Sequence, residues 1–250
     1  MNPLRTLIIA TLCVVMLSAC DKQIVPIADA APAPTPVDVT RVPVPRPEPV
    51  PMPQPGTRPP LVADTPAAAP EVVRDPYTGP GIKYRALIVR EAQFRFGIPA
   101  PAPVIAAQIQ QESAWRPDAR SPVGAQGLMQ FMPATSRWVD TLTAFGTLDP
   151  FNPTWSIRAG VWYDRWIYDR IKRYETDCDR WHFTLASYNG GLGWTYKRQD
   201  RSDAPGNWTL TGAINPGITP ANQRENQHYS ERILIRHQPQ FAAWGKTVCT

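Results

Sequence analysis

The segment from Ile24 to Pro80 is dominated by proline, alanine and valine, and every second residue between Val42 and Pro53 is a proline. Proline has no backbone N–H, so such a run supports neither a helix nor the interior of a sheet. It favours an extended polyproline II conformation with little apolar surface to bury. We therefore expect a disordered, Pro-rich linker over residues 20–80 and a folded domain over residues 81–250.

A linker of this composition is suited to act as a spacer, since about sixty residues reach roughly 190 Å when fully extended. A Pro-rich ligand for a peptide-binding module is the alternative. No aromatic-flanked core motif accompanies the prolines, which favours the spacer.

The residues before the linker have the pattern of an export signal. Arg5 gives a basic start, and Leu7–Leu17 is an apolar run too short to cross a bilayer as a helix. The run ends in Leu17-Ser18-Ala19-Cys20, which resembles a bacterial lipobox, with cleavage before Cys20 and acylation of its thiol. A plain signal peptide that happens to contain a cysteine is the alternative. We expect residues 1–19 to be a lipoprotein signal peptide.

Lipidation at Cys20 would make a membrane one partner of the protein, because several acyl chains on one cysteine give stable anchoring. Asp21 resembles the signal by which enterobacterial lipoproteins remain in the inner membrane. We therefore expect a lipoprotein at the periplasmic face of a bacterial membrane, with the inner membrane favoured.

Cys178 and Cys249 remain once the signal and the lipidated position are set aside. In an oxidising periplasm two leftover thiols suggest one disulfide. Loop closure over so long a span would stabilise the domain by about 4 kcal/mol. Two free thiols are the alternative.

The folded part is basic: residues 81–250 contain 20 Lys and Arg against 14 Asp and Glu. A basic domain can bind nucleic acid. Here the basic residues are spread out with no dense cluster, and the chain carries an export pattern. An anionic cell-wall polymer fits both facts better, so we expect no nucleic-acid partner.

Apolar residues recur at helical spacing through most of the domain, with no sustained period of two, which predicts a mostly α fold. Residues 201–220 are rich in Gly, Pro, Asn and Thr, and we expect a long loop or a small irregular insertion there. The aromatic stripe of Trp155, Trp162 and Trp166 is expected in the core. We expect one helix from near Tyr84 to Gly97, a second from near Pro103 to about Glu112, and a third that starts at Pro133. A fourth is expected to begin at Asn152-Pro153, with an apolar face that reaches Tyr174. Two more are expected over Arg180–Tyr188 and Asn222–His237.

Glu112 continues the apolar stripe of its helix, because it follows Ile105 and Ile109 at spacings of four and three. Partial desolvation there would raise the pKa of the Glu112 carboxyl, as a general acid near neutral pH requires. A glutamate at a helix end can equally turn to solvent, and the spacing alone leaves both interpretations open.

Several motifs of the domain stand in one order: Glu112-Ser113-Ala114-Trp115, Gly124-Ala125-Gln126-Gly127-Leu128-Met129-Gln130, Met132-Pro133-Ala134-Thr135, Ala186-Ser187-Tyr188-Asn189-Gly190-Gly191, and Glu225 with Tyr229. Together they resemble the signature of the soluble lytic transglycosylases, the lysozyme-like family 1 enzymes of bacteria and phages. The match covers roughly Lys83 to His237. Asn226 and Ser230 stand where Thr and Val are usual, departures expected to be peripheral, and a Gly-rich insertion follows Gln199.

The resemblance implies a lysozyme-like α fold that cleaves the β-1,4 bond between N-acetylmuramic acid and N-acetylglucosamine in peptidoglycan glycan strands. Glu112 would act as single acid and base. It would protonate the glycosidic oxygen and then accept the proton of the muramoyl C6 hydroxyl, giving a 1,6-anhydro sugar. A hydrolase normally needs a second carboxylate; Asp118, next along the chain, lies outside the motif.

The resemblance also implies roles for the residues around Glu112. Ser113 would bind near the acetamido or lactyl group, or cap the helix end. Tyr188 and Asn189 would position the substrate, with the tyrosine hydroxyl near Glu112. Tyr229 would contact the cleft or brace the Glu112 helix. The remaining expectations are that Met129 and Gln130 line the cleft beside Glu112, that Gly124 and Gly127 let the backbone turn closely under the sugar, and that Trp115 packs the loop.

A lysozyme-type muramidase on the same scaffold and a non-catalytic wall-binding module are the alternative functions. None of the three histidines, His182, His228 and His237, stands at a metal-ligand spacing from cysteines or acidic residues, so we expect no metal. No Gly-rich phosphate loop follows a strand, so we expect no nucleotide cofactor.

Overall fold

The structure is a computed structural model that describes residues 75–249. The predicted signal peptide, the lipidation site Cys20 and the linker up to residue 74 lie outside the described residues. Within the described part, no helix combines the length and the hydropathy that crossing a membrane requires.

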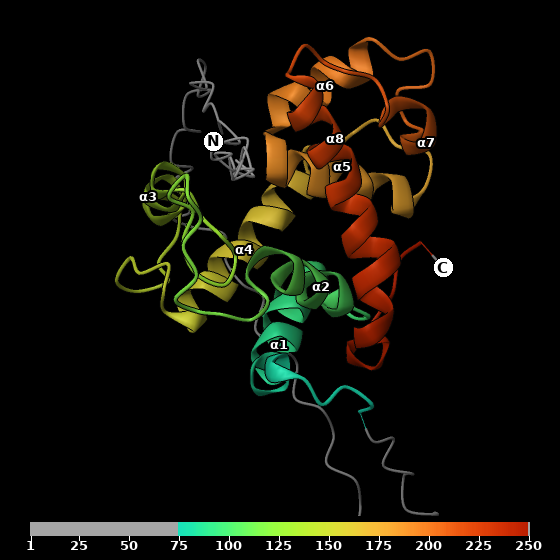
Figure 1. Cartoon of the computed structure of the whole chain (residues 1–250). Helices are drawn as coiled ribbons and strands as arrows, with labels where there is room; N and C mark the ends of the chain where they lie inside the picture. Colours follow the sequence, from blue (N-terminus) through green and yellow to red (C-terminus); the bar gives the residue numbers. More distant parts are fainter. Residues whose placement is uncertain (1–74, 250) are drawn as a thin grey trace, which may run out of the picture. The chain divides into compact units, whose positions relative to one another are not determined.

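The described residues fold into helices without an extended strand, which confirms the prediction of a mostly α domain (Figure 1). Isolated β-bridges of Gln126 with Arg120 and Phe131 are the only strand-like pairing among them. In chain order the elements are the 3-10 helix η1 (Pro80–Tyr84), α1 (Arg85–Phe96), α2 (Ala102–Ser113), α3 (Pro133–Leu142), α4 (Pro153–Tyr168), α5 (Asp177–Gly190), α6 (Leu192–Asp200), α7 (Trp208–Thr211), α8 (Pro220–Glu231), the π-helix η2 (Arg232–His237) and the 3-10 helix η3 (Gln238–Trp244).

Local capping signals set several of these boundaries. The Asn152 side chain accepts hydrogen bonds from the N–H groups of Thr154 and Trp155, which starts α4 at the predicted position. Thr176 and Asp179 form a reciprocal capping box at the start of α5. Gly97 ends α1 with φ +80°, a conformation that glycine adopts readily. The start of α4 and the end of α1 were therefore predicted correctly, whereas α5 begins three residues before the predicted Arg180.

The C-terminal half departs from the predictions in two places. The apolar pattern of α4 continues to Tyr174, but the helix ends at Tyr168, whose carbonyl oxygen accepts two hydrogen bonds from the guanidinium of Arg180. Residues 192–200 form α6, which was not predicted. The insertion that follows contains α7 and is fixed by Gln199, whose Nε2 donates to the carbonyls of Arg173 and Pro205.

Helix α2 lies at the centre of the domain and is buried from Ala102 to Ile109. It packs against α1 on one side and against η2 and η3 on the other, while α4 packs against α1 and α5 (Figure 1). Trp155 is buried as expected, whereas Trp162 and Trp166 are half-buried against Trp138 of α3. Because α2 is enclosed by these helices, the position at which its C-terminal end reaches the surface is fixed.

Residues 75–80, which we had assigned to the linker, are part of the folded domain. The Trp244 Nε1 donates to Asp75 Oδ2 at 2.6 Å, and Arg85 forms an ion pair with the same oxygen at 3.2 Å. The Tyr77 ring lies 4.7 Å from the Phe241 ring. The prediction failed because these contacts join residues far apart in the sequence, which composition does not reveal.

The rings of Tyr77, Tyr84, Trp115, Phe241 and Trp244 together form what we call the entry cluster. Trp115 is 3 % exposed within it, which confirms that this residue packs the loop after α2.

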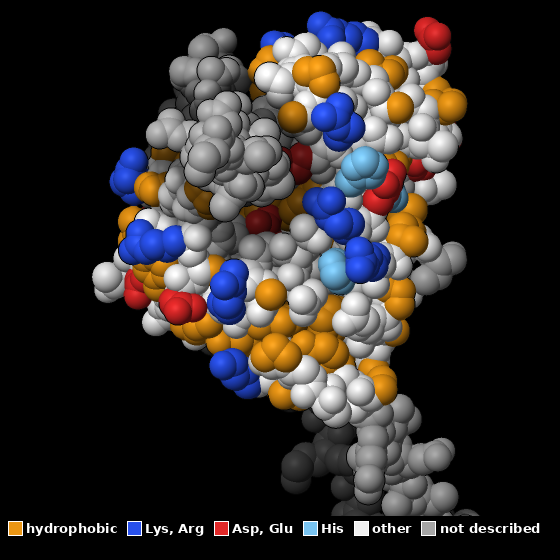
Figure 2. Space-filling model, viewed as in Figure 1, with side chains coloured by type: hydrophobic (Ala, Val, Ile, Leu, Met, Phe, Trp, Pro, Cys, Tyr) orange, Lys and Arg blue, Asp and Glu red, His pale blue; other side chains and the backbone are white. Residues whose placement is uncertain are grey.

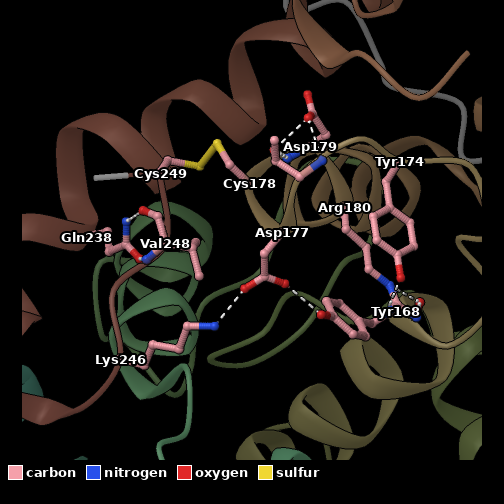
Figure 3. Close-up of polar contacts among 11 residues, drawn as sticks. Tyr168, Tyr174, Asp177, Cys178, Asp179, Arg180, Gln238, Lys246, Val248 and Cys249 are labelled. Atoms are coloured by element: carbon pink, nitrogen blue, oxygen red, sulfur yellow. Dashed lines mark hydrogen bonds and ion pairs between the residues drawn. A yellow bond between two sulfur atoms is a disulfide. The ribbon is translucent and has the colours of Figure 1, made fainter.

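A disulfide joins Cys178 in the first turn of α5 to Cys249 at the end of the described chain (Figure 3). Beside it, Asp177 accepts a hydrogen bond from the Tyr168 hydroxyl at 2.7 Å and pairs with the ammonium group of Lys246 at 2.8 Å. Covalent and ionic contacts thus hold the C-terminal segment against α5.

Candidate active site

Glu112 stands in the last turn of α2, half-exposed, where the buried helix reaches the surface. The helix stops directly afterwards because Ala114 and Trp115 adopt positive φ values of 49° and 67°. A non-glycine residue in this region is uncommon, and two in succession turn the chain sharply. The turn sends the following loop past the Glu112 carboxyl.

Tyr229 of α8 contacts the carboxyl directly. Its hydroxyl donates a hydrogen bond of 2.5 Å to Glu112 Oε1, and its side chain is 3 % exposed. Burial raises the pKa of Tyr229 well above its ordinary value, and the negative charge of Glu112 raises it further. The phenol therefore stays protonated and acts as a donor to the carboxylate. Of the two roles expected for Tyr229, the one this contact supports is bracing.

Tyr188 of α5 is buried nearby, and its hydroxyl donates to the Met129 carbonyl oxygen at 2.7 Å. Burial raises the pKa of Tyr188 well above its usual range, with further contributions from the charges of Glu112 and Asp164. The hydroxyl thus lies within the field of Glu112, as expected, but its hydrogen bond ties α5 to the loop after α2.

Two expectations about that loop need correction. The Met129 side chain is fully buried, so it does not line a cleft. It packs on Gly160 of α4, where an added Cβ would collide with it. Gln130 is 7 % exposed, and its Nε2 donates to the carbonyls of Ala119 at 3.2 Å and Gly127 at 2.8 Å. Both side chains hold the loop, and Met129 contacts the site through its carbonyl group.

Gly127 has a conformational requirement of its own. Its φ is +75°, and an added Cβ would overlap the carbonyl oxygen of Pro150. The neighbour that requires glycine here is the Pro150 carbonyl of another loop, and a close approach to the sugar stays a prediction.

Ser113 is also placed differently from the favoured expectation. Its hydroxyl donates to the Ile109 carbonyl oxygen at 3.3 Å, and the residue is 2 % exposed. This contact lies within the last turn of α2, so in this structure Ser113 supports the helix end.

Asn189 follows Tyr188 in the last turn of α5 and is 8 % exposed. Its Oδ1 accepts a hydrogen bond from Nδ2 of Asn226 at 3.0 Å, and Asn226 in turn accepts from the guanidinium of Arg198. Asn226 and Ser230 were expected to be peripheral, which is wrong. Asn226 is 5 % exposed, and the Ser230 hydroxyl pairs with His182 Nδ1 at 2.8 Å.

Sequence reasoning missed Asp164 and Gln108. Asp164 of α4 is fully buried, and its Oδ1 accepts a hydrogen bond from Gln108 Nε2 at 3.3 Å. Burial raises the pKa of the Asp164 carboxyl well above its usual range, the Gln108 hydrogen bond opposes this, and the charge of Glu112 adds to it. The available signal was position: Asp164 lies on the apolar face of α4, seven residues after Ile157 and three before Ile167.

Cys178, His182 and Cys249 bring one nitrogen and two sulfur atoms within 4.8 Å of one another. The spacing argument against a metal did not foresee this grouping, because Cys249 is distant in sequence. The two sulfur atoms are bonded to each other, so neither is a thiolate that could hold a metal ion.

Figure 2 shows one face of the molecule, where acidic atoms lie recessed near the centre and Lys and Arg side chains are scattered around them. No dense basic cluster appears on this face. The distribution matches the charge pattern of the sequence.

The described residues thus form a helical domain in which a buried helix delivers one glutamate to the surface beside two buried tyrosines. Residues 89–211 match the family model described as "Transglycosylase SLT domain", so the chain contains a domain of that family.

Curated relatives agree with this assignment. The membrane-bound lytic murein transglycosylase F of Vibrio parahaemolyticus is 40% identical over 90 residues, which cover 36% of this chain and 16% of the relative. The protein of the same name from Maricaulis maris is 37% identical over 114 residues, covering 46% of this chain and 23% of the relative. The chain thus spans less than a quarter of the length of these relatives.

Two solved structures resemble the fold. The 70 kDa soluble lytic transglycosylase SLT70 from Escherichia coli aligns with a TM-score of 0.52 and 25% identity, over 64% of this chain and 24% of that one. An inactive glutamate-to-glutamine mutant of lytic transglycosylase Slt from Pseudomonas aeruginosa aligns with a TM-score of 0.51 and 25% identity, over 67% and 25%.

Proposed function

We propose that this protein is a peptidoglycan lytic transglycosylase that cleaves the bond between N-acetylmuramic acid and N-acetylglucosamine with Glu112 as its single acid and base. The observation that carries the proposal is the hydrogen bond from Tyr229 to Glu112, within a domain that matches the transglycosylase family. The relatives' printed name, lytic murein transglycosylase, supports the same substrate.

The first step is protonation of the leaving group. Tyr229 donates to Oε1 of the Glu112 carboxyl, and in this step the carboxyl also carries a proton of its own. That proton passes to the glycosidic oxygen as the bond to C1 of the muramoyl sugar breaks. The N-acetylglucosamine side leaves with a hydroxyl group, and C1 acquires oxocarbenium character.

The second step closes a ring on the same sugar. The C6 hydroxyl attacks C1 and gives up its proton to the Glu112 carboxylate, which regenerates the neutral acid. No water is consumed, and the product ends in a 1,6-anhydro sugar. Tyr229 donates to the carboxylate that forms between the steps, where a hydrogen bond to a charged oxygen is strongest.

The surroundings of Glu112 favour this intramolecular route over hydrolysis. A hydrolase would use a second accessible carboxylate as nucleophile or base. Asp164, whose charge interacts with Glu112, is fully buried and hydrogen-bonded to Gln108. It is therefore unable to reach a sugar or a water molecule on the surface.

Mass spectrometry of the muropeptides that the purified protein releases from peptidoglycan tests the proposal, with Glu112→Gln as the matched variant. Products one water lighter than reducing-end muropeptides, absent with the variant, are the expected result. Reducing-end products would identify a muramidase instead. No product from either protein would support a wall-binding module.

We also propose that the protein is exported and anchored to a membrane through lipidated Cys20, at the periplasmic face. The Leu17-Ser18-Ala19-Cys20 pattern supports this, and the relatives' name includes the words membrane-bound. Labelling of cells with a radioactive fatty acid should mark the wild-type protein and leave Cys20→Ser unlabelled. Label on the Cys20→Ser protein would contradict lipidation at this position.

A further inference from the structure

Arg198 of α6 is a buried cation whose hydrogen bonds all go to neutral groups. The residue is 1 % exposed, and it donates to the Ile214 carbonyl at 3.0 Å, to Gln223 Oε1 at 2.8 Å and to Asn226 Oδ1 at 2.9 Å. Among residues 75–249, none forms an ion pair with it. Burial lowers the pKa of Arg198 to about 10, so the guanidinium remains charged at neutral pH.

The charge of Arg198 fixes which way the Asn226 amide faces. A guanidinium has donors and no acceptor, so only the Asn226 oxygen can face it. The carbonyl oxygen of Ala186, which can only accept, lies 2.7 Å from Asn226 Nδ2 and requires the same orientation from the opposite side. Two independent neighbours therefore set one orientation, although the amide atoms look alike in shape.

The orientation of the Asn226 amide in turn determines the orientation of the Asn189 amide. Nδ2 of Asn226 lies 3.0 Å from the Asn189 side chain, which must meet that donor with Oδ1. The group that Asn189 retains for another partner is its NH₂, a donor. A neutral residue in place of Arg198 could donate or accept, and the Ala186 carbonyl alone would then hold the orientation of the Asn226 amide.

We propose that Arg198 and Asn226 are positioning residues that hold the Asn189 amide with its NH₂ group directed to the substrate, where it binds an acceptor oxygen of an acyl group on the glycan. This inference rests on the proposed function and deepens it. Asn189 directly follows Tyr188, which interacts with the charge of Glu112, and an acetamido carbonyl or a lactyl carbonyl supplies the oxygen that such a donor binds. Through this chain of contacts the Arg198 charge and the Ala186 carbonyl together set which group Asn189 offers to the substrate.

The test exchanges amides for carboxylates of the same shape. Asn189→Asp removes the NH₂ donor but keeps an oxygen for Asn226. Asn226→Asp keeps the contact with Arg198 but presents an acceptor to Asn189, whose amide would then turn and expose its oxygen. Asn222→Asp, on the same helix α8, is the matched control for the added charge.

Binding of tetra-N-acetylchitotetraose is measured by calorimetry in the Glu112→Gln background, so the readout is independent of catalysis. Each of Asn189→Asp and Asn226→Asp should weaken binding about tenfold, the double variant should be no weaker than either single one, and the Asn222→Asp control should bind normally. In the active enzyme the same two changes should raise KM with little change in kcat.

Wild-type affinity in a folded Asn226→Asp variant would overturn the proposal that Asn226 orients Asn189. Additive losses of affinity in the double variant would overturn it as well. If Asn226→Asp does not fold, Asn226→Ala takes its place, because it removes the donor that orients the Asn189 amide, and unchanged affinity there would also overturn the proposal. Failure of the tetrasaccharide to bind the parent protein would end the inference. The proposed function is judged separately, by the products released from peptidoglycan.

Discussion

The Tyr229 hydroxyl donates a hydrogen bond of 2.5 Å to Glu112 Oε1 and joins residues 117 positions apart in the chain. Tyr229 comes from α8, which lies beyond the matched family segment, and Glu112 comes from α2 within it. Helix α8 is therefore a structural part of the site, because without it the carboxyl would lose its buried donor.

Replacing Tyr229 by Phe should lower kcat/KM by about ten- to a hundredfold, because a hydrogen bond to a charged group contributes about 1.5–3 kcal/mol. Release of soluble muropeptides over time measures the effect. Tyr196→Phe is the control, since it removes a phenol that donates to a backbone carbonyl on the exposed side of α6. Equal rates for Tyr229→Phe and the wild type would show that this contact does not assist the reaction.

The gain in unfolding free energy of Asp164→Asn over the wild type should become larger as the pH rises. The folded-state pKa of Asp164 lies above its unfolded value of about 3.9, so the folded protein binds more protons between these two values. Its stability therefore falls as the pH rises through the folded pKa, and Asn removes this loss. Urea unfolding from pH 4 to pH 8 measures it, with exposed Asp203→Asn as control. A stability difference that does not vary with pH would contradict the buried, proton-holding state.

His182 should have the opposite effect, so that the free energy of unfolding decreases as the pH falls. Burial lowers its pKa to about 4, below the unfolded value of about 6.5, and the charge of Asp179 opposes the shift. The unfolded state therefore binds more protons between pH 6.5 and 4, and up to roughly 3 kcal/mol of stability is lost as the pH falls through this window. His182→Asn should show a smaller loss in unfolding experiments, whereas exposed His228→Asn should behave as the wild type does.

Removing the disulfide should lower the free energy of unfolding by about 4 kcal/mol, because the Cys178–Cys249 bond closes a loop of 71 residues. Denaturant unfolding of the Cys178→Ser, Cys249→Ser double variant measures it. A dithiol reductant provides the internal control, since it should destabilise the wild type and leave the double variant unchanged. Equal stability of oxidised and reduced wild type would argue against the bond.

Chains that begin at residue 75 and at residue 81 should differ in thermal stability. The shorter one lacks the Asp75 carboxylate and the Tyr77 ring, so the Trp244 indole loses its acceptor and the entry cluster loses a member. We expect destabilisation by roughly 2–4 kcal/mol, measured as a shift in the unfolding midpoint. Tyr77→Ala in the longer chain should account for part of it. Identical unfolding midpoints for the two chains would show that residues 75–80 do not stabilise the folded domain.

Local signals carried most of what could be predicted. The cap at Asn152 and the glycine at Gly97 identify helix ends because their effects act within a few residues. The position of Glu112 on α2 likewise follows from spacing and motif. Helix α6 has no side-chain N-cap and starts at a glycine with φ +99°, so the sequence around it lacks the usual starting signal.

Contacts between distant segments account for the errors. Met129 appears in a cleft motif, yet the close approach permitted by Gly160 draws its side chain into the core. Asn226 looks like a minor departure from a motif, and only the fold sets it between Arg198 and Asn189. Neither neighbour can be inferred from periodicity, because each lies more than twenty-five residues away.

The entry cluster has a mechanical consequence. Tyr77 and Trp115 belong to it together, and Trp115 lies three residues after Glu112. A pulling force applied to the chain at Asp75 is therefore expected to act first on the Trp244 indole and on the neighbouring rings, which contact Trp115.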